Sequence, residues 1–179
     1  PEVFDPNNPA WVEIWNNVFM AYNEQPDGSF IPLKQRNVDT GLGLERVLAV
    51  LNHEPDIYLS DLFQPVIAYL QKVSGRLYGS ETRTFRIIAD HLRASAFLLA
   101  DEKAVTPSNK DQGYILRRLI RRAVRLVYNW PMPASEILSG VVEQIIVTMG
   151  EAYPELVRRH DFIISEITKE INKFNHTLD

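Results

Sequence analysis

The sequence predicts an α+β fold that is mostly α-helical, in which a short antiparallel β-hairpin is followed by an all-helical region. Three observations predict it. Aromatic and β-branched residues flank a Pro-Asp-Gly turn at residues 26–28. Apolar residues recur at three- and four-residue spacings from Leu44 onward. Glycines and prolines separate these periodic stretches into helix-sized pieces.

The β-rich end comes first in the chain. Residues 11–22 are rich in aromatic and β-branched types and are expected to form a strand. Pro26 fixes its φ angle and Gly28 tolerates a positive φ, so the chain is expected to turn there. Residues 30–33 predict a second short strand, and a further short strand is expected to end near residues 38–39.

The helical region follows a glycine-containing turn and a first helix at residues 44–52. A break that contains Pro55 divides the chain into two predicted domains, residues 1–55 and residues 56–179. The second domain is predicted to contain helices only. They are expected at residues 60–74, 83–101, 113–128, 135–150 and 156–178.

The composition is that of a globular protein, with 45% hydrophobic residues, 23% charged residues and a net charge of −4. The absence of cysteine excludes disulfides and thiolate metal ligands. No apolar run reaches the roughly 20 residues that span a bilayer, and no signal peptide is visible, so a cytoplasmic protein with no membrane partner is expected. The sequence begins in a Pro/Asn-rich loop without an initiator Met and stops within a helical pattern, which predicts an internal piece of a longer chain.

The octad from Asp39 to Arg46, DTGLGLER, combines a carboxylate, two glycines and a guanidinium around one bend. Glycines let a ligand approach the backbone closely. The helix that follows offers unpaired N–H groups, which suit a phosphate. The Arg46 guanidinium can bind phosphate oxygens and also stack on a base. These residues alone allow two interpretations. One is a nucleotide site, and the other is a tight turn followed by a surface Glu-Arg pair.

The pattern Gly-x-Gly-x-Glu-Arg after a strand is similar to motif 3 of class II aminoacyl-tRNA synthetases. The longer string VDTGLGLER resembles the form of this motif in the alanyl-tRNA synthetase family, which commonly has Met at the position of Leu42. The resemblance implies that Arg46 is the catalytic group that contacts the ATP phosphates and lies over the adenine. It also implies that Gly43 and Glu45 belong to the ATP site.

The same resemblance implies an alanine site. Asp39 would hold the ammonium group of alanine, and Gly41 would line the small amino-acid pocket. A cation needs a carboxylate partner where water is excluded, which agrees with the implied role of Asp39. Upstream, residues 13–16 (EIWN) resemble a segment of the same family in which Asn16 and Val18 would face the alanine.

The predicted helix at residues 113–128 carries five arginines within an arc of roughly 140°, at about 100° per residue. They are Arg117, Arg118, Arg121, Arg122 and Arg125. Like charges this close repel one another unless acidic side chains or a polyanion neutralise them. Internal ion pairs and contacts with RNA phosphates are therefore both open. The acidic side chains considered as internal partners are Asp90, Asp101, Glu102 and Asp111.

Asn109 lies in a Pro-Ser-Asn loop just before this helix. Its amide can read base edges in the shallow minor groove of A-form RNA, or it can serve as a helix N-cap or in an Asx-turn. Residues 86–102 and 107–125 closely resemble the tRNA-recognition region of the alanyl-tRNA synthetase family, although Gln112 replaces the usual Arg. The resemblance implies that Asn109 takes part in reading the acceptor-stem G·U pair and that the five arginines bind tRNA.

The resemblance covers roughly residues 3–178 and implies a part of an alanine–tRNA ligase. Such a ligase activates alanine with ATP and Mg²⁺ and transfers it to the 3′ end of tRNA(Ala). The implied partners are the tRNA(Ala) acceptor stem, alanine, ATP and the remainder of the parent synthetase chain. Class II motifs 1 and 2 are not found, so the chain alone is not expected to form the adenylate.

No cluster of His, Asp and Glu has the spacing of a metal site, so zinc is not expected. Two other classes of function stay open beside the ligase. One is a non-catalytic helical RNA-binding module. The other is a structural helical domain whose arginines serve internal ion pairs only.

Overall fold

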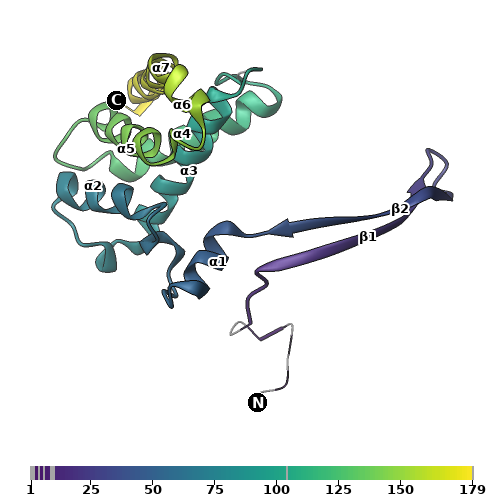
Figure 1. The fold of residues 1–179 in the computed structure, drawn as a ribbon. Helices are drawn as coiled ribbons and strands as arrows, with labels where there is room; N and C mark the ends of the chain where they lie inside the picture. Colours follow the sequence, from purple (N-terminus) through teal and green to yellow (C-terminus); the bar gives the residue numbers. More distant parts are fainter. Residues whose placement is uncertain (1–2, 4, 6, 9–10, 104, 179) are drawn as a thin grey trace. The chain divides into compact units, whose positions relative to one another are not determined.

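The computed structural model describes residues 3, 5, 7–8, 11–103 and 105–178. It divides into two compact units, Pro1–Ile57 and Tyr58–Asp179. Figure 1 shows the first unit as a β-ribbon with one helix and the second as a bundle of helices. The predicted α+β, mostly α fold is therefore confirmed.

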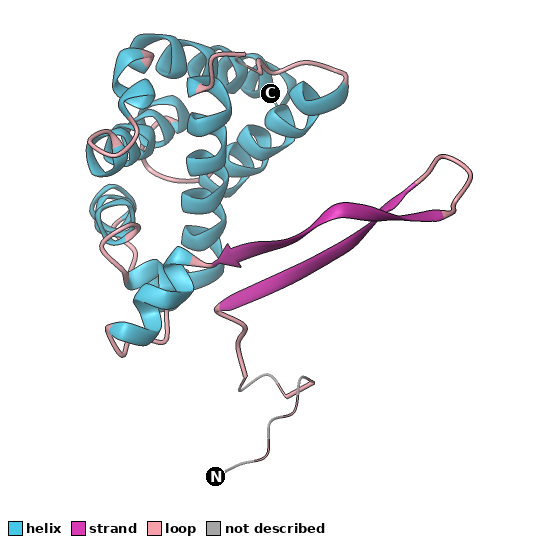
Figure 2. Cartoon of the chain, turned by 45° about the vertical axis from the view of Figure 1, so that its right-hand side comes forward, coloured by secondary structure: helices cyan, strands magenta, loops and turns pink. Residues whose placement is uncertain are grey.

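The first unit contains an antiparallel ribbon of two strands, β1 (Trp15–Glu24) and β2 (Phe30–Leu42). Figure 2 shows the two strands twisted about each other. The predicted turn is confirmed: Gly28 has a φ of 81°, and the Gln25 N–H donates to the Ser29 carbonyl at 2.8 Å.

Three details of the predicted ribbon are wrong. β1 begins at Trp15, not at residue 11, and the expected short strand near residues 38–39 is part of one continuous strand β2. The strand also takes in Gly41, which the sequence had placed in the turn. The reason is the pairing itself, because Trp15 and Asn16 supply cross-strand partners for Leu42 and Gly41. The cross-strand hydrogen bonds of the continuing ladder stabilise the strand more than the low strand propensity of glycine destabilises it.

The ribbon exposes apolar side chains on both faces. Phe19 is 79% exposed and lies on one face with Trp15 and Val38, and Val18 is exposed on the other face. Ala49 is the one buried residue among the described residues of the first unit. A two-stranded ribbon that buries so little gains little stability from its own packing.

Helix α1 (Leu44–Leu51) follows β2 after the single residue Gly43. The Gly43 N–H donates to the Ile14 carbonyl at 3.0 Å, which ties the start of the helix to the segment before β1. The predicted helix at residues 44–52 is thus confirmed to within one residue.

The second unit is helical throughout its regular elements. Its α-helices are α2 (Gln64–Ser74), α3 (Thr82–Ala100), α4 (Asp111–Val127), α5 (Ala134–Met149), α6 (Pro154–Arg158) and α7 (His160–Leu178). Two short 3₁₀ helices, η1 (Ile57–Leu59) and η2 (Tyr78–Ser80), accompany them. The predicted helix at residues 156–178 is instead two helices, because the backbone leaves the helical region at Arg159.

The core of the second unit forms from one apolar stripe on each long helix. On α3 the stripe includes Phe85, Ile88 and Leu92, all with 0% exposure. Residues at three- and four-residue spacing share one helix face, so α4, α5 and α7 bury similar stripes against α3. Each large apolar side chain buried in this way contributes about 1.5–3 kcal/mol to stability.

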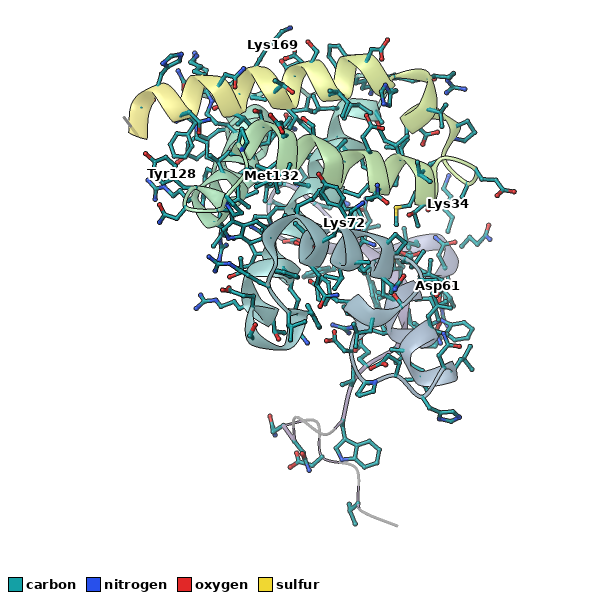
Figure 3. The ribbon with its side chains drawn as sticks, turned by 90° about the vertical axis from the view of Figure 1, so that its left-hand side faces the viewer. Lys34, Asp61, Lys72, Tyr128, Met132 and Lys169 are labelled. Carbon is teal, nitrogen blue, oxygen red and sulfur yellow. The ribbon has the colours of Figure 1, made fainter. Side chains whose placement is uncertain are left out.

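Figure 3 shows α7 with Lys169 on its outer side, pointing away from the helices beneath it. The inner side of α7 carries Ile163, Ile167 and Ile171, which have no exposed surface. Among the described residues, no helix is both long and apolar enough to cross a lipid bilayer.

Candidate functional site

The four residues predicted to bind alanine form two cross-strand pairs of the ribbon, with the pair of Asn17 and Thr40 between them. Asn16 lies opposite Gly41, and Val18 lies opposite Asp39. Side chains alternate between faces along a strand, and directly opposed residues share a face. Positions 16, 18, 39 and 41 therefore lie on one face of the ribbon.

This face carries the Asp39 carboxylate, the Asn16 amide and Gly41, which has no side chain. The Asp39 side chain is exposed, and its Oδ1 accepts a hydrogen bond from the Thr40 N–H at 2.9 Å. A β-carbon added to Gly41 would lie 3.7 Å from Asn16 Oδ1, an ordinary contact distance. Gly41 thus leaves the position beside the Asn16 amide open, while Asp39 supplies negative charge on the same face.

Trp15 and Thr40 lie on the opposite face of the ribbon. The Trp15 indole N–H donates to Thr40 Oγ1, and that hydroxyl donates in turn to the Asn16 carbonyl at 3.3 Å. These contacts hold the register of β1 and β2 at the pair formed by Asn16 and Gly41.

Arg46 lies in the first turn of α1 and folds back toward the ribbon. Its Nη1 donates to the Glu13 carbonyl at 2.7 Å, just upstream of Asn16 in the chain. A β-carbon on Gly43 would lie 3.2 Å from Arg46 Cδ, so Gly43 lets the arginine stem pass close to the backbone. The guanidinium and the pair of Asn16 and Gly41 therefore lie at the same end of the ribbon.

The role of Gly43 differs in part from the sequence interpretation. The glycines were interpreted as room for a ligand, but the group that approaches Gly43 closely is the Arg46 side chain. Glu45, also predicted for the ATP site, is half-buried. Arg46 also borders a concavity of about 440 Å³ that is otherwise mostly apolar and includes Val12, Ala49 and His53.

The five arginines of α4 divide into two groups. Arg117 and Arg121 turn toward α7 and meet Glu170, a carboxylate that is 4% exposed. Arg121 Nε donates to Glu170 Oε1 at 2.6 Å. Arg117 Nε lies 3.3 Å from the same oxygen, close enough for an ion pair but not aligned as a hydrogen bond. The interpretation of internal ion pairs is therefore confirmed for these two arginines, and the interpretation of contacts with RNA phosphates stays a prediction.

The partner acid was not the one expected. Glu170 lies in α7, whereas the candidates from sequence were Asp90, Asp101, Glu102 and Asp111. Among the described residues, no ion pair joins any of those four to an arginine of α4. One signal could have revealed Glu170: it is the acidic residue within the buried stripe of Ile163, Ile167 and Ile171.

The other three arginines, Arg118, Arg122 and Arg125, are exposed. Together with Arg121 and Phe174 they line an open concavity of about 420 Å³. Within the part of the chain that the structure describes, none of the three forms an ion pair. An exposed cationic surface without acidic partners suits a polyanion such as an RNA backbone.

The Phe174 ring helps to order this surface. The Arg121 and Arg125 guanidinium carbons lie 4.8 Å and 5.6 Å from its centroid. Arg118 similarly lies 5.7 Å from the Tyr114 centroid. These cation–π contacts hold flexible side chains without neutralising their charge, and neither aromatic residue was identified from the sequence.

Asn109 is exposed in the loop before α4 and is not the N-cap of that helix. The N-cap is Lys110, which makes no side-chain capping hydrogen bond. Asn109 Oδ1 instead accepts a hydrogen bond from Arg117 Nη1. The local turn is held by Ser108, whose Oγ donates to the Lys110 carbonyl at 2.9 Å. The N-cap and Asx-turn alternatives for Asn109 are thus replaced by a side-chain contact with α4.

His91 is a packed helix residue of α3. Burial lowers its pKa below the ordinary value, and nearby Arg122 lowers it further, although the contact with Asp90 opposes both effects. Among the described residues, no group of three or more His, Cys, Asp or Glu side chains has the geometry of a metal site.

The chain belongs to a family of class II aminoacyl-tRNA synthetases: residues 2–179 match the family described as tRNA synthetases class II (A). Among curated proteins, it is 44% identical over 171 residues to the alanine–tRNA ligase of Borrelia garinii subsp. bavariensis. It is 43% identical over 176 residues to the alanine–tRNA ligase of Xanthomonas euvesicatoria pv. vesicatoria.

These matches cover 94% and 98% of this chain but only 29% and 19% of the two relatives. The chain therefore spans less than a third of the length of the ligases that it resembles. The family expected from the DTGLGLER and PSN motifs is confirmed.

Proposed function

We propose that this chain is part of an alanine–tRNA ligase and that its two units serve different substrates. In this proposal the first unit, predicted as residues 1–55, contributes part of the alanine and ATP site of the catalytic domain. The second unit, predicted as residues 56–179, recognises the acceptor stem of tRNA(Ala). The identity of 42–44% to relatives with that name supports the assignment.

The observation that carries the proposal for the first unit is the shared face of Asn16, Val18, Asp39 and Gly41. Alanine has an ammonium group, a carboxylate and one methyl. Asp39 pairs with the ammonium, and the space above Gly41 takes the methyl. Asn16 borders that space, and Val18 lies on the same face opposite Asp39, where we expect it to limit the size of the amino-acid side chain. An extra methylene is worth about 1–3 kcal/mol to such a pocket.

Arg46 acts on ATP in this proposal. Its planar guanidinium binds phosphate oxygens and stacks on the adenine. The hydrogen bond from Arg46 to the Glu13 carbonyl holds the guanidinium at the end of the ribbon that carries Asn16 and Gly41. Gly43 lets the arginine stem pass, and Glu45 borders the same site. The alanine carboxylate attacks the α-phosphate of Mg²⁺-ATP, the bond to pyrophosphate breaks, and alanyl-adenylate forms. The chain's contribution to this step is position and charge.

The second unit binds RNA through Asn109 and the arginines of α4. Arg118, Arg122 and Arg125 contact phosphates, while Arg117 and Arg121 are held by Glu170 and support the surface. Asn109 reads a base pair in the minor groove of the acceptor stem. The tRNA 3′ hydroxyl then attacks the alanyl carbonyl, and AMP leaves. A ligase with this role acts in the cytoplasm.

The test is substrate preference in a ligase that contains this chain. We expect alanine, among the amino acids, to support the fastest ATP–pyrophosphate exchange, and tRNA(Ala) to be the acceptor charged. Faster exchange with serine or glycine, or charging of another tRNA, would contradict the proposal. A non-catalytic RNA-binding module is the second candidate, because the exposed arginines suit RNA whatever the first unit does. Unchanged exchange after Arg46→Ala would favour it.

A further inference from the structure

Glu170 is a charged side chain in an apolar setting. Its neighbours on the inner stripe of α7 are Ile167 and Ile171, and the carboxylate itself is 4% exposed. A buried carboxylate is costly unless cations pair with it and donate hydrogen bonds. Two arginines of α4 pair with it: Arg121 Nε donates a hydrogen bond to Oε1 at 2.6 Å, and Arg117 Nε lies 3.3 Å from the same oxygen as an ion pair.

The contact with Glu170 determines where Arg117 points. The Arg117 side chain is only 12% exposed, and its Nε lies within ion-pair distance of Glu170 in α7. The guanidinium is planar and rigid, so fixing Nε also fixes the direction of the terminal nitrogens. One of these, Nη1, donates to Oδ1 of Asn109 in the loop before α4.

The contact with Arg117 in turn determines what Asn109 presents to solvent. An asparagine amide has one acceptor oxygen and one donor nitrogen. Arginine can only donate, so the oxygen must face Arg117 and the Nδ2 group must face away. Asn109 is exposed, and no hydrogen bond from its Nδ2 is found among the described residues.

We propose that Glu170 is a positioning residue for RNA recognition: through Arg117 it holds the Asn109 amide so that its N–H donor faces the RNA. This inference rests on the proposed reading of the acceptor stem by Asn109. It adds that Asn109 recognises an acceptor on a base edge. In a minor groove such acceptors are the O2 of a pyrimidine and the N3 of a purine. Both G·U and G·C carry them, but wobble pairing displaces the uracil from the position of the cytosine, so a donor held in one place distinguishes the two pairs by the position of the acceptor.

The rival explanation is that Glu170 only joins α7 to α4. In that case its removal weakens the second unit as a whole and lowers the charging of every tRNA by one factor. The positioning role makes a different prediction, because it changes the preference for one base pair over another. The ratio between two tRNAs therefore separates the two explanations.

The experiment uses a ligase that contains this chain and two forms of tRNA(Ala), one with the acceptor-stem G·U pair and one with G·C in its place. The ratio of their kcat/KM values in aminoacylation measures the discrimination. The variants are Asn109→Ala, Glu170→Ala and Glu170→Gln. Glu166→Gln is the matched control, because this acid on the same helix pairs with Lys169 at 2.7 Å instead of with α4.

We expect Asn109→Ala to lower the ratio by about 10-fold, the order of the effect of one wrong base pair in a recognised site. Glu170→Ala should lower it by a similar factor, and Glu170→Gln by less because the amide oxygen still accepts from arginine. The double variant Asn109→Ala/Glu170→Ala should lose no more than Asn109→Ala alone, as expected for residues that act in series. Denaturant titration of each variant should show that the helices of the second unit remain folded.

Asn109→Asp tests the direction of the amide. Aspartate keeps an oxygen for Arg117 and removes the donor, so we expect the same loss as with alanine. Retained discrimination in Asn109→Asp would overturn the assigned donor. Loss in Asn109→Ala with an unchanged ratio in Glu170→Ala would overturn the positioning role alone. An unchanged ratio in Asn109→Ala would instead refute the proposed function of Asn109, and this inference with it.

Discussion

Gly113 and Ser108 approach so closely that no other residue fits at position 113. A β-carbon added to Gly113 would lie 2.3 Å from Ser108 Oγ and 2.5 Å from the Thr106 carbonyl oxygen. The Ser108 N–H also donates to the Gly113 carbonyl at 3.0 Å. This contact packs the loop that carries Asn109 against the first turn of α4.

Gly113→Ala should therefore displace the loop. We expect a loss of about 1–3 kcal/mol in the free energy of unfolding, as for other overpacked sites, measured by denaturant titration of the chain. Gly79→Ala is the control, because a β-carbon there meets nothing within 4 Å. It should change stability by less than about 0.5 kcal/mol. Equal effects of the two substitutions would show that the loop is not packed as described.

His160 should make stability depend on pH. Its Nδ1 lies 2.8 Å from Asp161 and its Nε2 lies 2.7 Å from Glu143, and these contacts raise its pKa above the ordinary 6.5. A raised pKa means that the folded state binds the proton more tightly than the unfolded state. The stabilisation is fully present below pH 6.5 and is lost as the pH rises through the folded pKa.

The measurement compares the wild-type chain with His160→Gln by denaturant unfolding at pH 5.5 and pH 8.5. The stability difference in favour of wild type should be larger at pH 5.5. His91 should behave in the opposite way, since its pKa is lowered, and its contribution is present above pH 6.5 and lost on acidification. A larger His160 effect at pH 8.5 would contradict the raised pKa.

The exposed arginines should control the salt dependence of RNA binding. Each phosphate contact contributes roughly 0.7–0.9 to the slope of log K against log salt. We expect replacement of Arg118, Arg122 and Arg125 by Gln to lower that slope by about 2–3 units, measured by titrating the chain with an acceptor-stem RNA hairpin. Lys169→Gln is the control, since this lysine points away on the outer side of α7. An unchanged slope in the triple variant would mean that these arginines do not contact RNA.

Arg46→Lys should weaken ATP use in a ligase that contains this chain. Lysine keeps the charge but cannot stack on a base or donate to the Glu13 carbonyl and a phosphate from one planar group. The expected result is a rise of about 10-fold or more in KM for ATP in pyrophosphate exchange, as for a lost charged hydrogen bond. Arg36→Lys, elsewhere on β2, is the matched control. A KM as low as that of the control would argue against a contact with ATP.

Much of the fold follows from local patterns in the sequence. The apolar residues at helical spacing, together with the prolines and glycines between them, predict helices whose ends lie within a few residues of those observed. Gly28 predicts the turn of the ribbon. Strand ends were less predictable, because β2 continues through Gly41 only where Asn16 supplies a partner. That partner depends on register, which no local propensity encodes.

In the candidate sites, too, the residues within short sequence motifs could be predicted, and those that depend on tertiary packing could not. DTGLGLER and PSN identify Asp39, Arg46 and Asn109 because these residues lie within short motifs. Glu170 is 49 residues from Arg121 in the chain, and its role depends on how α7 packs against α4. A single acid in an apolar stripe indicates a buried partner, but only tertiary structure identifies which one.

The central claim is that Asp39 holds the ammonium group of alanine, and the KM for alanine tests it most directly. In a ligase that contains this chain, alanine-dependent pyrophosphate exchange should be measured for Asp39→Asn and for Asp27→Asn, a matched change at the ribbon turn. We predict that Asp39→Asn raises the KM for alanine by about 10- to 100-fold, since hydrogen bonds to charged groups contribute ~1.5–3 kcal/mol. Equal KM values for alanine in the two variants would contradict the claim.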